Sequence, residues 1–305
     1  MIHTLITDEV KRQIIRTVED KIPENDQVRF AICERQAALA IIRYCLGEDY
    51  FKREFRLDAD FEKFPASEYV SHSTAENLIK VKTLAQCVED LYECMGFEHK
   101  RKELRGTRFD SVAFELLIAS YFRELGCELV FPGPKGCDFI LENSVQAECK
   151  FMENWTSNEK EIASRFVNYL EETTARIRDH SQGILVVGFP IDHFPTVDER
   201  ASIRWALQLA FEMVSNSQPR FINRVLGVRV LAEITTSIGP SRLMRSFRRI
   251  LAYQSRDYLA LPKPVRKALE DDQDRLKPRT WVNYKGIESI RTPRLKGGES
   301  PESVV

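Results

Sequence analysis

Apolar residues recur at helical spacing through most of the first hundred residues. Three segments share this period: EVKRQIIRTVEDKI, VRFAICERQAALAIIRYCLG and STAENLIKVKTLAQCVEDLYECMG. A spacing of three and four residues places apolar side chains on one face of an α-helix, so each segment predicts a helix. The third has a Ser or Thr cap and ends at Gly96, whereas Phe61 to Tyr69, which contains Pro65, predicts a connecting loop. We therefore expect a helical N-terminal region over residues 1–99.

The period of the pattern changes after a basic link, HKRKELRGTR. The segment FDSVAFELLIASYFRELG predicts a helix with an Asp or Ser cap that ends at Gly126. CELVFP, CDFIL and VQAECKF then predict three short strands, joined by the turns GPKG and ENS. NEKEIASRFVNYLEETTARIRD predicts a second helix, and the apolar run QGILVVGFP predicts a strand at the centre of a sheet. This order of elements indicates an α/β fold.

Charged residues interrupt the second and third strands. Side chains alternate along VQAECKF, so Gln146, Glu148 and Lys150 share one face. Asp138 lies on the preceding strand, and the short ENS turn folds it back toward Glu148. On the first helix of this region, Glu115 points along a nearly apolar face. Buried charges are costly unless something pairs them, and two converging carboxylates offer oxygen ligands for a hard divalent cation such as Mg²⁺.

This arrangement resembles the PD-(D/E)xK nuclease superfamily, the restriction-endonuclease-like fold, over residues 109–190. The resemblance implies an α-β-β-β-α-β core with a mixed central sheet flanked by helices. It also implies that Asp138 and Glu148 bind Mg²⁺, for which Mn²⁺ can substitute, and that Glu115 completes the metal site from the helix. Lys150 would orient or activate the attacking water. Cys137 stands where the motif has a proline, at a position that varies in the family.

The second helix of this region departs from one branch of the superfamily. The RecB-like branch carries Gln-x-x-x-Tyr on this helix, and here the chain has Arg165 and Tyr169, with arginine in place of glutamine. Both side chains are candidate contacts to a substrate strand, as is Gln146. The alternative for Gln146 is an ordinary surface polar residue, and the alternative for Glu115 is an ion pair with Arg123 or a lysine elsewhere.

Charge is unevenly distributed along the chain, although the net charge is only −1. Residues 1–99 contain 13 Lys and Arg against 19 Asp and Glu, whereas Pro240 to Lys296 contain 15 against 6. A basic C-terminal part indicates a docking surface for a polyanion. The candidate phosphate contacts are Arg242, Arg245, Arg248 and Arg249. The alternative is that SRLMRSFRRILAYQSRDYL is an amphipathic helix with a solvated basic face.

Composition excludes several classes of protein. With 305 residues, 43% hydrophobic and 30% charged, the chain is too apolar to be disordered and has room for one large or two modest domains. The longest apolar run, ILVVGF, is far below the roughly 18 residues of a membrane helix, and the N-terminus lacks a signal pattern. We therefore expect a cytoplasmic protein with no membrane partner. Seven cysteines without C-x-x-C pairs and five scattered histidines predict buried, reduced thiols and no zinc site.

Motifs of other enzyme classes are missing from the sequence. It contains no phosphate loop, no dinucleotide fingerprint, no nucleophile elbow and no H-E-x-x-H helix. The activity that the resemblance implies is Mg²⁺-dependent hydrolysis of phosphodiester bonds. DNA is preferred over RNA because the superfamily cuts DNA more often. Two alternatives stay open: a nucleic-acid-binding or assembly subunit that keeps the fold without cutting, and an unrelated α/β domain whose hairpin charges are structural.

The chain divides into three parts on these patterns. Residues 1–99 form the helical region, residues 100–238 the nuclease-like core, and residues 239–305 a basic extension with a loose tail. The sequence leaves open whether the N-terminal helices mediate a homodimer, sense a ligand or hold a protein partner.

Overall fold

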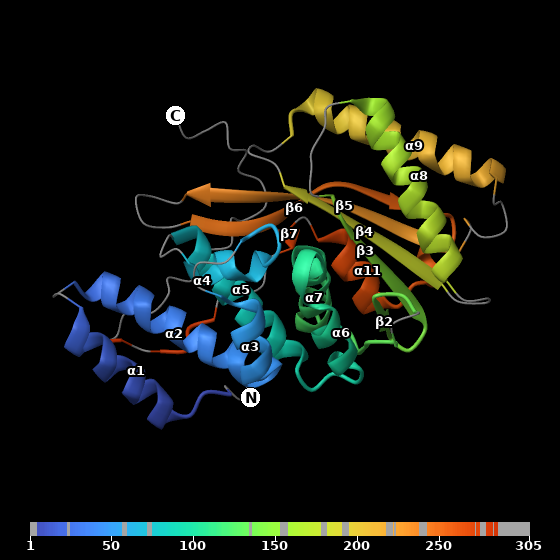
Figure 1. Cartoon of the computed structure of the whole chain (residues 1–305). Helices are drawn as coiled ribbons and strands as arrows, with labels where there is room; N and C mark the ends of the chain where they lie inside the picture. The colour runs from blue at the N-terminus through green and yellow to red at the C-terminus, as the bar shows by residue number, and fades with distance from the viewer. Residues whose placement is uncertain are drawn as a thin grey trace.

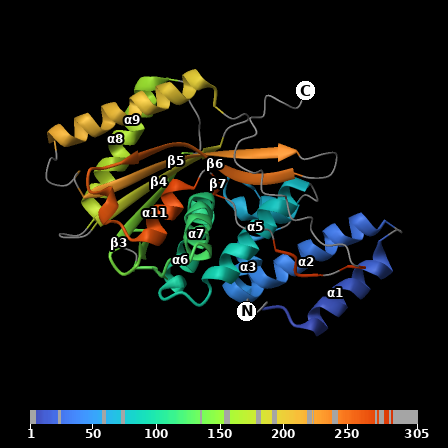
Figure 2. The same ribbon diagram turned by 180° about the vertical axis from the view of Figure 1, so that it is seen from behind.

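A mixed β-sheet with helices on both faces forms the centre of the protein (Figures 1 and 2). Helices α8 (Glu159–Arg176) and α9 (Val197–Ser217) lie on one face, and α7 (Phe109–Glu124) lies on the other with the N-terminal helices beside it. The α/β class predicted from the sequence is confirmed. This computed structural model describes residues 5–22, 25–56, 60–71, 75–133, 136–152, 158–177, 182–190, 195–217, 222, 224–237, 243–271, 273–274, 279–282 and 284–285.

In the described residues, the sheet has seven strands that pair in chain order. They are β1 (Leu129–Val130), β2 (Phe139–Leu141), β3 (Val145–Phe151), β4 (Gln182–Pro190), β5 (Val225–Ser237), β6 (Leu243–Gln254) and β7 (Gln273–Asp274). Strand β4 runs parallel to β3 and β5, and the other neighbouring pairs are antiparallel. The continuous apolar sequence of β4 is buried in the middle of the sheet, which confirms its predicted central position.

The predicted order of helix, three strands, helix and strand is present as α7, β1, β2, β3, α8 and β4. Helix α8 begins at Asn158, whose side chain accepts the backbone N–H groups of Lys160 and Glu161. The predicted Asp or Ser cap of α7 is wrong, because the helix begins one residue before Asp110, and Asp110 lies in its first turn. Gly126, with a φ of 90°, follows the end of α7 as expected.

Alternation along the central strands separates two hydrophobic clusters. Val145, Ala147 and Cys149 of β3 belong to the cluster that contains the apolar residues of α7. Leu185 and Val187 of β4 belong to the second cluster, which is formed with α8 and α9. Because successive side chains of a strand point to opposite faces, the remaining polar residues of β3 face α8, as the alternation predicts.

The three long N-terminal helices are confirmed as α1 (Asp8–Lys21), α2 (Asp26–Leu46) and α5 (Ala75–Leu91). Helix α5 ends five residues before the predicted stop, and its predicted Ser or Thr cap lies outside the described residues. Two short helices, α3 (Glu48–Glu54) and α4 (Glu68–Ser71), complete this part of the chain. The predicted loop before Tyr69 contains a 3₁₀ turn over Pro65–Ser67. None of the helices described here is long and apolar enough to cross a bilayer.

The basic link predicted between Gly96 and α7 contains a helix, α6 (Phe97–Glu103), and a 3₁₀ turn. Gly96 precedes α6 in the left-handed conformation, and a Cβ atom at this position would lie 1.9 Å from the carbonyl oxygen of Phe131. Phe97 packs against Phe131 with ring centroids 6.1 Å apart. This close contact fixes α6 beside the sheet, so that Lys100 is buried on it rather than solvated in a link.

Residues 243–254 form strand β6, so the alternative of an amphipathic helix is wrong for this segment. Strand β6 pairs with β5 from Gly227↔Gln254 to Ser237↔Leu243. Pairing with a long neighbouring strand therefore outweighs the helical spacing of apolar residues. Helix α11 (Lys263–Glu270) follows, and its buried residues join the cluster around α7.

A short C-terminal segment returns to the N-terminal helices. The backbone N–H groups of Trp281 and Val282 donate to the buried Glu34 carboxylate at 3.0 and 2.8 Å. Arg279 forms ion pairs with Glu89 and Asp90 of α5. One hydrophobic cluster consequently includes residues from both ends of the described chain. The division into three parts at residues 99 and 238 stays a prediction.

All seven cysteines lie within the described residues and are buried without disulfides. Burial raises the pKa of the Cys137 thiol to about 12, with Glu148 and Asp138 adding to the shift. With this raised pKa, the Cys137 thiol stays protonated at neutral pH and contributes to packing. The cytoplasmic location stays a prediction.

Replacing Gly96 with alanine should destabilise the protein by about 2–4 kcal/mol, because the methyl group would meet a backbone oxygen and displace α6. Gly126→Ala is the matched control, since Gly126 also has a positive φ but its Cβ would meet no described atom within 4 Å. Its cost should be about 1 kcal/mol. Urea unfolding measures both values. Equal losses would show that the contact between Gly96 and Phe131 does not hold α6.

Candidate active site

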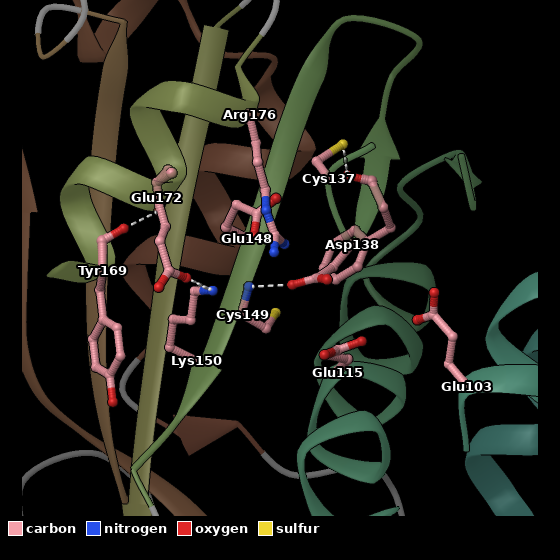
Figure 3. Close-up of polar contacts among 12 residues, drawn as sticks. Glu103, Glu115, Cys137, Asp138, Glu148, Cys149, Lys150, Tyr169, Glu172 and Arg176 are labelled. Carbon is pink, nitrogen blue, oxygen red and sulfur yellow. Dashed lines mark hydrogen bonds and ion pairs between the residues drawn. The ribbon is translucent and has the colours of Figure 1, made fainter. Parts of the chain in front are cut away.

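Backbone hydrogen bonds of the β2–β3 hairpin bring Asp138 next to β3. The Asp138 N–H donates to the carbonyl of Ala147 at 3.0 Å, and its carboxylate accepts the Cys149 N–H at 2.7 Å (Figure 3). The turn is tight because Glu142 and Asn143 both adopt positive φ values of 50° and 57°. The hairpin thus places the Asp138 carboxylate beside Cys149 of β3, the residue after Glu148.

Glu148 is a fully buried carboxylate with only part of its charge compensated. Its Oε2 atom lies 2.8 Å from Nη1 of Arg176, at the end of α8. Its Oε1 atom is buried and has no hydrogen-bond partner within the described chain. Burial, and then the charge of Asp138, raise the pKa of Glu148 to about 8, against the opposing effects of Arg176 and Lys150. The Oε1 atom therefore keeps an unused capacity to accept one hydrogen bond or to pair with one more positive charge.

Glu115 is buried on α7 and pairs with Lys100 of α6. The ammonium of Lys100 also lies 3.3 Å from Oδ1 of Asp138 and 3.1 Å from Oε2 of Glu103. Burial, and then Asp138, raise the pKa of Glu115 to about 7, while Lys100 opposes the shift. Burial alone would lower the pKa of Lys100, but Asp138, Glu115 and Glu103 together raise it. Lys100 is thus a buried ammonium that links three carboxylates.

Lys150 lies on the same face of β3 as Glu148. Its Nζ atom is 2.5 Å from Oε2 of Glu172 on α8, and its side chain is largely buried (Figure 3). The two side chains are neighbours on this face, two residues apart, and the ammonium of Lys150 lowers the pKa of Glu148. The face predicted for Glu148 and Lys150 is therefore shared in the structure, with Glu172 as an additional partner.

The candidate substrate contacts of this region are more dispersed. Gln146 is buried on β3. Arg165 forms an ion pair with Glu161 one turn earlier on α8, at 2.5 Å. Tyr169 packs against the α8 and α9 cluster, and its ring points away from Asp138 in Figure 3. Gln146 shares β3 with Glu148, whereas Arg165 and Tyr169 lie on α8, the helix that carries Glu172 and Arg176. A substrate contact stays a prediction for each.

The basic residues predicted to meet phosphates are only partly described. Arg242 lies outside the described residues. Arg245 and Arg248 have their backbones in β6, and their side chains are likewise outside the description. Arg249 donates to the carbonyl oxygen of Glu270 at 2.8 Å. Contact between this segment and nucleic acid stays a prediction.

Two cations of the site, Lys100 and Arg176, were not among the residues predicted from the sequence. The signal for Lys100 is its spacing from Phe97 and Leu104, which places it on an apolar helix face within a basic stretch. The signal for Arg176 is weaker: it follows Glu172 by one helical turn and thus shares a face with the partner of Lys150. A cation beside each buried acid is what the charge balance requires, and Lys100 is buried whereas Arg176 is partly exposed.

Within the described part of the chain, no three His, Cys, Asp or Glu side chains are gathered so that they could hold a metal ion. The three candidate carboxylates instead pair with cations: Lys100 contacts both Glu115 and Asp138, and Arg176 pairs with one oxygen of Glu148. The donor chemistry nevertheless fits Mg²⁺, which prefers carboxylate oxygens. The Oε1 atom of Glu148, buried without a partner among described atoms, is available as a ligand. The metal site stays a prediction.

Comparison with known proteins assigns no family to this arrangement. The chain matches no protein-family model, no curated protein and no solved structure. Its function is therefore inferred from the side chains described above.

Replacing Arg176 with methionine should lower the free energy of unfolding by about 1–3 kcal/mol, because buried Glu148 would lose its cation. Glu148→Gln in the same background should recover part of this loss, since a neutral amide needs no counter-charge. Urea unfolding of the two single variants and the double variant gives the coupling between the residues.

The matched control is Arg165→Met, which removes an ion pair from the same helix whose carboxylate, Glu161, is exposed rather than buried. Its effect should be below about 1 kcal/mol. If both arginine substitutions cost the same, the pairing of Arg176 with Glu148 has no special role in stability.

Proposed function

We propose that this protein is a Mg²⁺-dependent nuclease with a restriction-endonuclease-like core, hydrolysing phosphodiester bonds in DNA. The observation that carries the proposal is the pair Asp138 and Glu148, brought together by a hairpin, with Lys150 on the same strand face as Glu148. A structural salt bridge alone leaves no reason for an oxygen of Glu148 to be buried without a partner among the described residues.

The topology supports the same proposal. Strands β1 to β3 form an antiparallel meander, α8 crosses over one face of the sheet, and β4 returns parallel to β3. Helix α7 covers the other face and carries Glu115 toward the hairpin (Figure 3). This order agrees with the core that the sequence resemblance implies.

The side chains have distinct roles under this proposal. A bound divalent cation would lower the pKa of the attacking water and offset charge on the scissile phosphate. Asp138 and Glu148 would supply oxygen ligands for it, and Glu115 would complete the metal site from α7. Lys150 contributes a fixed positive charge beside the phosphate, and Glu172 holds its ammonium in position through their ion pair.

A second candidate function is a nucleic-acid-binding or assembly subunit that keeps this core without cutting. The observation that favours it is the compensation of charge by Lys100 and Arg176, which pair with all three carboxylates. A cleavage assay on double-stranded, single-stranded and branched DNA and on RNA, with Mg²⁺ or Mn²⁺, distinguishes the two functions.

Lys150→Ala should reduce the cleavage rate by about two to four orders of magnitude, because the lost charge acts mainly as the transition state forms. Affinity for DNA should change little, and circular dichroism should show an intact fold. Lys160→Ala is the control, since Lys160 is an exposed lysine on α8. Cleavage by Lys150→Ala at the parental rate, with the same Mg²⁺ dependence, would remove Lys150 from the reaction.

Replacing the four arginines of the basic segment with serine should weaken binding to duplex DNA and make it less dependent on salt. Each lost phosphate contact lowers the salt slope by roughly 0.9. The four residues are Arg242, Arg245, Arg248 and Arg249. A control variant with Arg12→Ser and Arg16→Ser, at exposed positions of α1, should keep the parental slope. An unchanged slope in the fourfold variant would place the DNA contacts elsewhere.

A further inference from the structure

We propose that Lys100 is an internal counter-ion that occupies the place of the divalent cation, so that metal binding requires its ammonium to leave Glu115 and Asp138. The inference rests on the proposed function, because it concerns the metal site of that reaction. It assigns a regulatory role to a residue outside the hairpin, on α6.

The geometry places one ammonium among three carboxylates from three elements. Lys100 Nζ contacts Oε2 of Glu115, lies 3.3 Å from Oδ1 of Asp138 and lies 3.1 Å from Oε2 of Glu103. Figure 3 shows these carboxylates on α7, at the start of the hairpin and on α6. Lys100 is only 6% exposed, so its charge is weakly screened by water and depends on these partners.

A divalent cation and this ammonium compete for the same oxygens. Each is stabilised by the negative charge of Glu115 and Asp138, and two positive charges at neighbouring positions repel each other strongly in a buried site. While Lys100 pairs with Glu115 and Asp138, a divalent cation is attracted to these carboxylates less strongly than it would be if they had no counter-charge. The resting protein therefore binds metal more weakly than its acidic residues alone would allow.

Glu103 offers the displaced ammonium a second position. It lies on α6 one turn after Lys100, and its side chain is 20% exposed, compared with 5% for Glu115 and 8% for Asp138. Arg108 lies 3.8 Å from the same Glu103 oxygen. A rotation of the Lys100 side chain toward Glu103 would keep one ion pair and release the two buried carboxylates to the metal.

The anchoring of α6 limits this movement to the side chain. Gly96 and Phe97 pack closely against Phe131 at the start of the helix, so the backbone of Lys100 has little freedom. The position of the ammonium and the occupancy of the metal site are consequently linked equilibria. The factor by which the bound metal shifts the equilibrium of the ammonium equals the factor by which the position of the ammonium changes metal affinity.

Calorimetric titration of chelator-treated protein with Mn²⁺ and with Mg²⁺ tests this linkage directly. Lys100→Met removes the charge and keeps a long side chain, so it should bind the metal roughly tenfold to a hundredfold more tightly than the parent. Its thermal midpoint should be lower without metal and should rise more when metal is added. Lys100→Arg, which keeps the charge, should bind no more tightly than the parent.

Two further variants provide the controls. Lys102→Met removes an exposed lysine from the same helix and should leave metal affinity unchanged. Glu103→Gln removes the second position for the ammonium, so it should weaken metal binding in the parent but have a smaller effect when combined with Lys100→Met. If Lys100→Met does not fold, Lys100→Gln replaces it in this comparison.

The outcomes separate this inference from the proposed function. If the parent binds metal and Lys100→Met binds it equally or more weakly, the counter-ion role of Lys100 is wrong while the metal site stands. If neither the parent nor any Lys100 variant binds Mn²⁺ or Mg²⁺, the metal site is wrong and both proposals fail. If Lys100→Met binds metal more tightly than the parent, and adding Asp138→Asn to it abolishes this binding, both proposals are supported.

Discussion

Burial of three carboxylates in one place is the constraint on which the rest of this structure depends. Glu115, Asp138 and Glu148 are all removed from water, and none of them is stable there as an isolated charge. Two cations meet this requirement from different elements: Lys100 from α6 and Arg176 from α8. The pKa values of Glu115 and Glu148 are nevertheless raised, so the compensation is incomplete. A polar cluster of this kind adds little to stability compared with apolar packing. Carboxylates with pKa values raised in this way are found preferentially at functional sites, although ion-pair networks also produce them.

The architecture brings these charges together from both faces of the sheet. Helix α7 packs beneath β3 and presents Glu115, while α8 packs above the same strand and presents Glu172 and Arg176 (Figures 1 and 3). Asp138 directly precedes β2, at the open end of the β2–β3 hairpin. The two hydrophobic clusters hold the helices on either side of the sheet. The charged side chains meet where β3 extends past its pairing with β2.

Several elements of this arrangement follow from local sequence. The alternation of VQAECKF gives β3 with its observed bounds and places Glu148 and Lys150 on one face. The apolar run of β4 and the helical periods of α7 and α8 are equally local. Local sequence does not predict strand β6 in the same way, because the spacing of its apolar residues also suits a helix. Pairing with β5 determines that the segment is a strand. The basic stretch before α7 predicts a link because most of its residues are charged, whereas the structure has helix α6 there, with Phe97 and Lys100 buried.

The sequence by itself determined which residues lie on which face of each strand and helix, because the periods of 2.0 and 3.6 residues are properties of the backbone. It thereby identified Asp138, Glu148, Lys150 and Glu115 as candidates for one site. Only the tertiary structure decided which cations neutralise them. Lys100 is 38 residues from Asp138, and Arg176 is 28 residues from Glu148. Such pairs depend on how α6 and α8 dock against the sheet, and docking is set by the packing of side chains distant in sequence, which no local pattern records.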